Sequence, residues 1–244
     1  MLAVHELEVE PGGELLITGS SGVGKSTLLH LIAGLLDADA GSVAVAGTDI
    51  QALRGPARDA LRGRQIGMIF QTFHLLPGMS AIENVELALL FGTMPPAEHR
   101  ARALELLEKL GITHPRRPVE KLSVGQQQRV AIARALVQEP ELVLADEPIA
   151  SLDPRNTRIV MDALQRLNRH FGITVICNLH DLDIAKDYCD RLVGMAQGRI
   201  VFDGAPEALT EATARELYGL EAEDAMNVLP PSVPARLPEL AAVA

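Results

Sequence analysis

The strongest constraint on this chain is a glycine-rich segment at residues 19–27, Gly-Ser-Ser-Gly-Val-Gly-Lys-Ser-Thr, which fits the pattern G-x-x-x-x-G-K-[ST]. A short apolar stretch at 15–18 precedes it, and an apolar helical pattern at about 26–35 follows it. The glycines let the backbone curl until successive N–H groups point at one centre, and the helix N-terminus adds partial positive charge. A strand, loop and helix in this order predict a phosphate-binding loop on a parallel α/β sheet.

Each residue type in this loop suits contact with a nucleotide. Lys25 is expected to reach the β- and γ-phosphates, and the Ser26 hydroxyl is expected to bind Mg²⁺. The alternative, a glycine turn before an ordinary helix, is disfavoured by the strand–loop–helix context. The predicted nucleotide-binding residues are Gly19, Ser20, Ser21, Gly22, Val23, Gly24, Lys25, Ser26 and Thr27.

A second motif, Leu-Val-Leu-Ala-Asp-Glu at 142–147, is an apolar strand that ends in two acids. The carboxyl edge of a parallel sheet is where such sheets bind ligands. Asp146 is therefore expected to belong to the Mg²⁺ site, and Glu147 is expected to polarise the attacking water. Solvated acids at a strand end are the plainer alternative, which the glycine-rich loop makes less favourable.

The rest of the chain alternates between strand-like and helical patterns around a helical middle. Strands that alternate with helices predict a mostly parallel sheet with helices on both faces. The expected fold is thus an α/β P-loop NTPase core with an inserted helical lobe at about 72–137. Residues 1–18 are predicted to form a strand, a turn and a strand. We expect one domain over 1–221 and a Pro- and Ala-rich, poorly ordered tail over 222–244.

Composition excludes several classes of protein. The only cysteines are Cys177 and Cys189, so a disulfide scaffold and a four-cysteine zinc site are excluded. A net charge of −10 argues against a general nucleic-acid binder, which needs a basic face. The longest apolar run, at 28–36, is too short to span a bilayer, and no signal peptide is visible at the N-terminus. A membrane role is therefore expected to come through a partner.

A third motif, Leu-Ser-Val-Gly-Gln at 122–126, opens a predicted helix and completes a resemblance. From about residue 3 to 218 the chain resembles the ATP-binding subunit of ABC transporters. The family's motifs occur in its order: the phosphate loop, a glutamine loop at Gln71, the signature at 122–126, the Walker B strand at 142–147, a D-loop at 151–153 and a switch histidine, His180.

The resemblance implies an ATPase whose subunits close as a dimer around two ATP molecules, either as a homodimer or as a pair within the transporter. The signature residues would act in trans across the two-fold interface, and Asp153 would couple the two sites. His180 would contact the γ-phosphate, and Gln71 would bind Mg²⁺, sense the water and link to a membrane permease. Catalytic roles thus fall to Glu147, His180 and Gln71, and the Mg²⁺ ligands would be Ser26, Gln71 and Asp146. The signature residues are Ser123, Val124, Gly125 and Gln126.

Two departures from the family pattern stand out. Val124 replaces the usual second glycine of the signature, and because valine rarely adopts positive φ, the backbone there is expected to stay in ordinary regions. No aromatic residue precedes Gly19, where the family usually stacks adenine.

The resemblance favours two kinds of transporter. Residues 47–147 resemble the lipoprotein-release and macrolide-export class, whereas residues 147–204 resemble phosphonate-import ATPases. We favour the export class, because the lobe after Gln71 is where the family meets its permease, and keep phosphonate import as the alternative. A non-transport ABC ATPase of DNA repair or translation is the alternative from another class. The subunit is expected at the cytoplasmic face of the cell membrane.

Overall fold

The computed structural model describes residues 1–150 and 152–218. One six-stranded sheet, in the order β4-β5-β6-β1-β7-β8, forms its centre, and a two-stranded sheet joins β2 to β3. All neighbours in the large sheet are parallel except β7 and β8. The strands are β1 (Glu14–Thr18), β2 (Ala44–Val45), β3 (Thr48–Asp49), β4 (Ile66–Ile69), β5 (Leu142–Asp146), β6 (Thr174–Asn178), β7 (Leu192–Ala196) and β8 (Arg199–Gly204).

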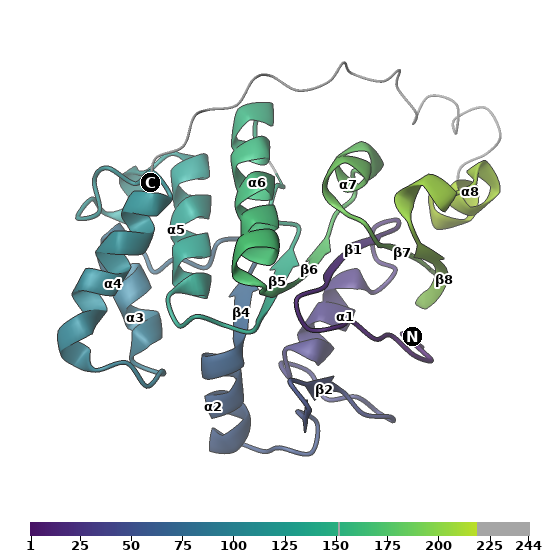
Figure 1. Cartoon of the computed structure of the whole chain (residues 1–244), viewed down its shortest axis with the longest axis horizontal. Coiled ribbons are helices and arrows are strands. Elements are labelled where there is room, and N and C mark those ends of the chain that lie inside the picture. The colour runs from purple at the N-terminus through teal and green to yellow at the C-terminus, as the bar shows by residue number, and fades with distance from the viewer. Residues whose placement is uncertain (151, 219–244) are drawn as a thin grey trace.

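The helices complete the predicted β/α alternation. Figure 1 shows α6 and α7 on one side of the sheet and α1 on the other. The helices are α1 (Lys25–Ile32), α2 (Pro56–Gln65), α3 (Ala81–Leu89), α4 (Pro96–Lys109), α5 (Val124–Leu136), α6 (Pro154–Phe171), α7 (Leu182–Tyr188) and α8 (Glu211–Tyr218), with short 3₁₀ turns η1 (Val119–Lys121) and η2 (Pro206–Ala208). This is the predicted α/β fold.

The central strands are buried on both faces because their side chains alternate between two clusters. On β5, Val143 and Ala145 join the cluster that also holds α5, α6 and α7, whereas Leu142 and Leu144 join the cluster around α1. Two-sided burial explains why the strand sequences are continuously apolar rather than alternating.

The predicted helical lobe is confirmed as α3, α4, η1 and α5. Both α3 and α5 begin with a capping box, in which a serine side chain and the side chain of the third helical residue satisfy each other's backbone N–H groups. The serines are Ser80 and Ser123, and the second was predicted as a helix start. The lobe is thus fixed by caps that the sequence carries.

The N-terminal prediction is wrong in part. The turn at Gly12 and the strand β1 form as expected, but residues 1–9 run without strand pairing. Ala3 N–H donates to Gly198 O at 2.7 Å, and no ladder continues from that bond. An apolar alternation becomes a strand only where it pairs with a neighbouring strand, and residues 1–9 do not form such a ladder.

The remaining boundaries concern the ends of the chain. Near the end of the described residues, α8 follows η2. The predicted tail at 222–244 lies outside the described residues, as do the last residues of the predicted domain and Ser151 of the predicted D-loop. Within the described part of the chain, no helix has both the length and the apolar character needed to cross a bilayer.

Candidate nucleotide-binding site

The phosphate loop leaves β1 and opens α1, as predicted. Gly22 and Gly24 have φ of 80° and 105°, backbone conformations that residues other than glycine rarely adopt. A Cβ at Gly19 would lie 2.2 Å from Met195 O, so the loop can pass beside β7 only with glycine there. No side chain caps α1, which leaves its first N–H groups to a ligand.

Lys25 lies inside the loop and is only 4% exposed. Its ammonium donates to Gly19 O at 2.8 Å and to Ser20 O at 2.9 Å. Burial lowers the pKa of Lys25, and the nearby carboxylates of Glu147 and Asp146 act in the opposite direction. The loop therefore holds a cation at its centre that forms no ion pair with the residues the structure describes.

Asp146 is the last residue of β5 and lies beside the phosphate loop. Ser26 Oγ donates to Asp146 Oδ1 at 2.8 Å, across 120 residues of sequence. Asn178 donates to the same carboxylate oxygen at 2.5 Å, and its own oxygen accepts the Glu147 N–H at 2.5 Å. A hydroxyl and a carboxylate are donors that suit Mg²⁺ when phosphates and water supply the remaining ligands.

Asn178 is a residue that the sequence prediction missed. It is fully buried at the end of β6, directly opposite Asp146 in the strand register. A buried amide makes this placement meaningful, because each of its polar atoms needs a partner. The available signal was a polar residue ending an apolar strand in line with the two acids.

Glu147 and His180 form a hydrogen-bonded pair next to Lys25. Glu147 Oε1 and His180 Nε2 lie 2.5 Å apart, and His180 Nδ1 lies 3.4 Å from Lys25 Nζ. Because an ammonium can only donate, Nδ1 is the acceptor, which leaves the proton on Nε2 facing the carboxylate. Glu147 also has a φ of 47°, a strained conformation for glutamate. The structure therefore brings Lys25, Ser26, Asp146, Glu147 and His180 together.

The signature residues lie elsewhere, at the N-terminus of α5. Among the described residues, no hydrogen bond joins 122–126 to the phosphate loop. Ser123 and Gln126 cap each other through the box described above, and Val124 is half exposed. Val124 keeps an ordinary negative φ at the start of the helix, as expected for valine.

Gly125 has a clear packing reason. A Cβ there would lie 2.3 Å from Asn156 Oδ1, so any other residue would require the Asn156 side chain to move. Asn156 is in turn bonded to Asp153, the residue that caps α6. Hydrogen bonds from the Asn156 backbone and side chain lower the pKa of Asp153. The signature helix therefore lies against Asn156, whose side chain is bonded to Asp153 of the predicted D-loop.

Gln71 lies at the same sheet edge as the acids without touching them. It follows β4, whose Ile69 pairs with Ala145 immediately before Asp146. Its side chain is exposed, and no hydrogen bond to Ser26, Asp146 or Glu147 is among its contacts in the described part of the chain. Its predicted role stays a prediction.

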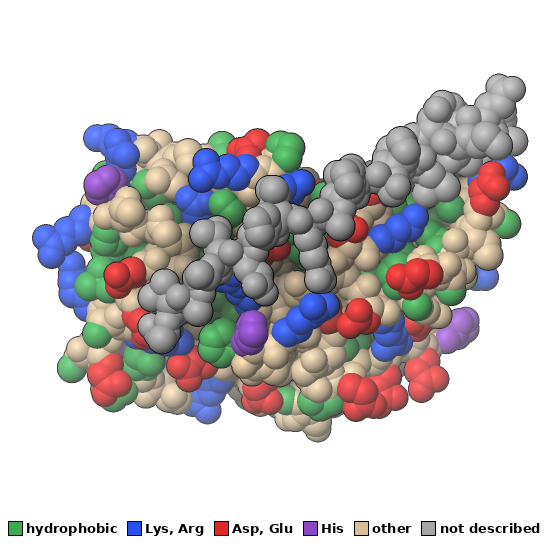
Figure 2. All heavy atoms as spheres, turned by 45° about the horizontal axis from the view of Figure 1, so that its top comes forward, with side chains coloured by type: hydrophobic (Ala, Val, Ile, Leu, Met, Phe, Trp, Pro, Cys, Tyr) green, Lys and Arg blue, Asp and Glu red, His purple; other side chains and the backbone are tan. Residues whose placement is uncertain are grey.

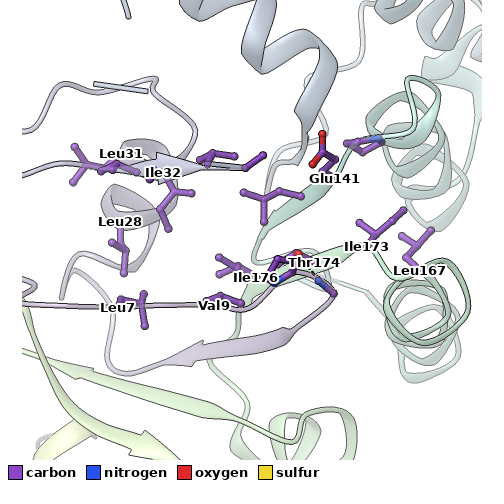
Figure 3. Close-up of a pocket in the computed structure, with 18 of the residues that line it drawn as sticks. Leu7, Val9, Leu28, Leu31, Ile32, Glu141, Leu167, Ile173, Thr174 and Ile176 are labelled. Atoms are coloured by element: carbon purple, nitrogen blue, oxygen red, sulfur yellow. Dashed lines mark hydrogen bonds between the residues drawn. The ribbon is translucent and has the colours of Figure 1, made fainter. Parts of the chain in front are cut away.

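A large apolar groove in the described part of the chain is separate from this site. A groove of about 2370 Å³ lies where β5 and β6 begin, at the opposite end of the strands from the phosphate loop. Figure 3 shows Leu28 and Ile32 of α1, Val9 and Ile176 lining it with apolar side chains. The polar groups that suit a nucleotide lie instead at the carboxyl ends of the strands.

The comparisons with known proteins agree with this geometry. A family model described as ABC transporter matches residues 2–150. The phosphonates import ATP-binding protein PhnC of Bradyrhizobium diazoefficiens is 52% identical over 97% of this chain and 91% of its own length. The protein of the same name from Ruegeria pomeroyi is 50% identical over 88% of this chain and 82% of its own length.

Solved structures give the same result. A dimeric, post-hydrolysis structure of an ATP-binding cassette bound to ADP and Pi is 36% identical, with a TM-score of 0.76 over 83% of this chain and 89% of its own. The cassette cbiO1 from Clostridium perfringens is 35% identical, with a TM-score of 0.74 over 82% of this chain and 80% of its own. The ordered motifs, the fold and these matches show that the chain belongs to the ABC transporter family and is an ATPase cassette of that family.

Proposed function

We propose that this chain is the ATP-hydrolysing subunit of a phosphonate importer. The observation that carries the proposal is the 50–53% identity to phosphonate import ATP-binding proteins along nearly the whole chain. The expected export class has no support among these relatives, although residues 47–147 resemble it. Phosphonate import, the alternative in the sequence analysis, is therefore the better-supported substrate class.

The geometry of the nucleotide site supports a separate role for each of its residues. The loop backbone and Lys25 bind the β- and γ-phosphates, since the ammonium is buried beside free helix N–H groups. Glu147 polarises the attacking water and takes up its proton. His180 holds the Glu147 carboxylate through Nε2 and turns toward the γ-phosphate when nucleotide binds.

The donor set at Asp146 suits a magnesium ion. Ser26 and Asp146 would hold it, and Gln71 would join them when its loop moves inward. Bound there, Mg²⁺ would neutralise charge on the phosphate oxygens during transfer. Asn178 orients Asp146 from behind, so the carboxylate faces Ser26 rather than rotating freely.

A second copy of the chain completes each site. Ser123 and Gly125 belong to a helix start at which Ser123 and Val124 are exposed. Within the described part of the chain this helix start has no hydrogen bond to the phosphate loop, and a similar cassette structure is dimeric. In a head-to-tail dimer the N-terminus of α5 would face the partner's γ-phosphate. Asp153, which touches the signature helix through Asn156, then connects the two sites.

The helical lobe is the proposed permease-docking surface. Leu90 and Phe91, just beyond α3, are 65% and 71% exposed. A hollow of about 540 Å³ lies between the glutamine loop and the signature helix, lined by Gln71, Leu75 and Val124 among others. A permease segment that moves on this surface would shift both the glutamine loop and the signature residues. The subunit would thereby sit on the cytoplasmic face of the membrane.

Charge supports a protein rather than a nucleic-acid partner. On the face shown in Figure 2, Lys and Arg side chains are interspersed with acidic and apolar ones. The chain carries 22 basic and 32 acidic residues. A DNA- or RNA-directed ATPase would be expected to present a basic field.

Genetic complementation tests the proposed substrate class. The chain is expressed, with its own permease and binding protein, in a bacterium that lacks phosphonate uptake and is given methylphosphonate as its phosphorus source. Growth is expected with the wild-type chain and not with Lys25→Ala. Failure to grow while the assembled transporter is present in membranes would contradict phosphonate import, and acquired macrolide resistance would favour the export class.

A further inference from the structure

The C-terminal helix α8 ends against the start of the phosphate loop. Leu217 O accepts the N–H of Ser20 at 3.1 Å, directly after Gly19. Tyr218 Oη lies 2.5 Å from Thr18 Oγ1, directly before Gly19. The last turn of α8 thus contacts the chain on both sides of the glycine at which the loop begins.

The same phenol also reaches the switch histidine. Tyr218 Oη donates to His180 O at 3.3 Å. A tyrosine has one O–H proton, so the Thr18 hydroxyl must be the donor in the shorter bond. Tyr218 therefore connects two segments that lie 162 positions apart and that both contact Lys25.

Packing fixes this contact. Thr18 is fully buried, and Leu217 is 1% exposed. A Cβ on Gly194, the β7 partner of Thr18, would lie 2.7 Å from Leu217 Cδ2, so glycine there makes room for α8. Burial raises the pKa of Tyr218, which keeps its phenol protonated and able to donate. A buried threonine hydroxyl without this partner would lose its hydrogen bond.

We propose that Tyr218 is a positioning residue for ATP hydrolysis, whose hydroxyl sets the phosphate loop relative to the His180 backbone. The proposal rests on the ATPase site described above and is independent of the transported substrate. With the hydroxyl present, His180 keeps its ring between Glu147 and Lys25. Without it, the loop still binds phosphate, because Ser20 keeps its bond to Leu217, but His180 loses one of its anchors.

Steady-state ATPase kinetics of the full-length chain provide the test. Tyr218→Phe is expected to lower kcat about threefold to tenfold, the effect of one lost hydrogen bond, and to change KM for ATP less than about twofold. Tyr188→Phe is the matched control, because Tyr188 Oη donates to Asp162 on the α6–α7 surface, away from the loop. Equal kcat values for the two phenylalanine variants would overturn the proposal.

A double-mutant cycle distinguishes a specific bond from a general loss of stability. Thr18→Val removes the other partner of the bond with little change of shape. The double variant Tyr218→Phe with Thr18→Val should be about as active as either single variant, because both remove one shared interaction. Losses in kcat that multiply would show that the two residues act independently, and would overturn the proposal.

Tyrosine fluorescence gives a readout that survives if Tyr218→Phe fails to fold. The chain has two tyrosines and no tryptophan, so Tyr188→Phe leaves Tyr218 as its single strong fluorophore. Emission of that variant is expected to change when MgATP binds, and to stay constant when Lys25→Ala is added. Unchanged emission at saturating MgATP would overturn the proposal. A wild-type chain without ATPase activity would instead contradict the proposed function.

Discussion

The phosphate loop and the signature turn both present a helix N-terminus, yet the structure treats them differently. The start of α1 has no side-chain cap, and its loop is bonded to β5, α8 and His180 in the same chain. The start of α5 is closed by its own capping box and exposed to solvent at Val124. The start of α1 is bonded to several other segments of its own chain, whereas the start of α5 is closed by its own side chains and stays exposed.

The difference teaches how the catalytic work is divided. The groups that we propose to bind phosphate and activate water already lie together within one chain, as electrostatic catalysis would require. The start of α5 is already closed by its capping box, so docking the signature onto a second phosphate loop needs little further ordering of its residues. Closure and reopening of the dimer can then carry the mechanical work.

The largest expected effect is on the phosphate-loop side. Lys25→Ala should weaken ATP binding about 100-fold or more, because two charge-assisted phosphate contacts are lost. Lys109→Ala is the control, since Lys109 lies on the surface of α4 paired with Glu105. Calorimetric titration with ATP measures both. Comparable affinity in the two variants would remove Lys25 from the site.

Glu147→Gln should separate binding from turnover. ATP affinity is expected to be retained, and turnover is expected to fall at least about 100-fold when the base is lost. Glu139→Gln is a matched control, because Glu139 shares the strained positive φ but pairs with Arg102 far from the loop. Normal turnover in Glu147→Gln would exclude Glu147 as the base.

A substitution at Ser123 tests the signature side alone. Ser123→Arg should leave ATP binding by a single chain intact, block dimer closure and lower ATPase activity by about tenfold or more, since a bulky cation would occupy the interface. Ser123→Ala separates this effect from the lost helix cap, which costs about 1 kcal/mol of stability. Unaltered hydrolysis in Ser123→Arg would refute the trans arrangement.

The smallest expected effect concerns Glu14, which lies at the start of β1, the end of that strand away from the phosphate loop. Burial raises the pKa of Glu14 from 4.5 to about 7, with Arg169 opposing and Asp190 adding to the shift. The folded chain therefore binds this proton more tightly than the unfolded chain, and stability falls as pH rises from about 4.5 to about 7.

Glu14→Gln should remove that dependence and stabilise the fold by roughly 1 kcal/mol at pH 8, a figure discounted for the partial exposure of the side chain. Urea unfolding at pH 5 and pH 8 measures it. The exposed Glu10→Gln is the control and should leave the pH dependence unchanged. ATP binding should be the same in both variants, since Glu14 lies at the far end of β1 from the loop.

Local signals explain what the sequence could predict. The phosphate loop, the acids of β5 and the Ser123 cap each depend on residues close together in the chain, and all appear in the structure as expected. Asn178 and Tyr218 depend on contacts across 32 and 200 residues. A polar residue at the end of an apolar strand is the one local hint of Asn178, and no local pattern marks Tyr218. Strand pairing is also non-local, which is why residues 1–9 were wrongly assigned a strand.

The solution mass of Glu147→Gln with and without MgATP, measured by light scattering on a sizing column, tests the two-chain site most directly. The account predicts a monomer without nucleotide and a dimer with MgATP, because the variant binds ATP and cannot hydrolyse it. Addition of Ser123→Arg should abolish the dimer. A chain that stays monomeric while saturated with MgATP would contradict the claim that the signature completes a partner's site.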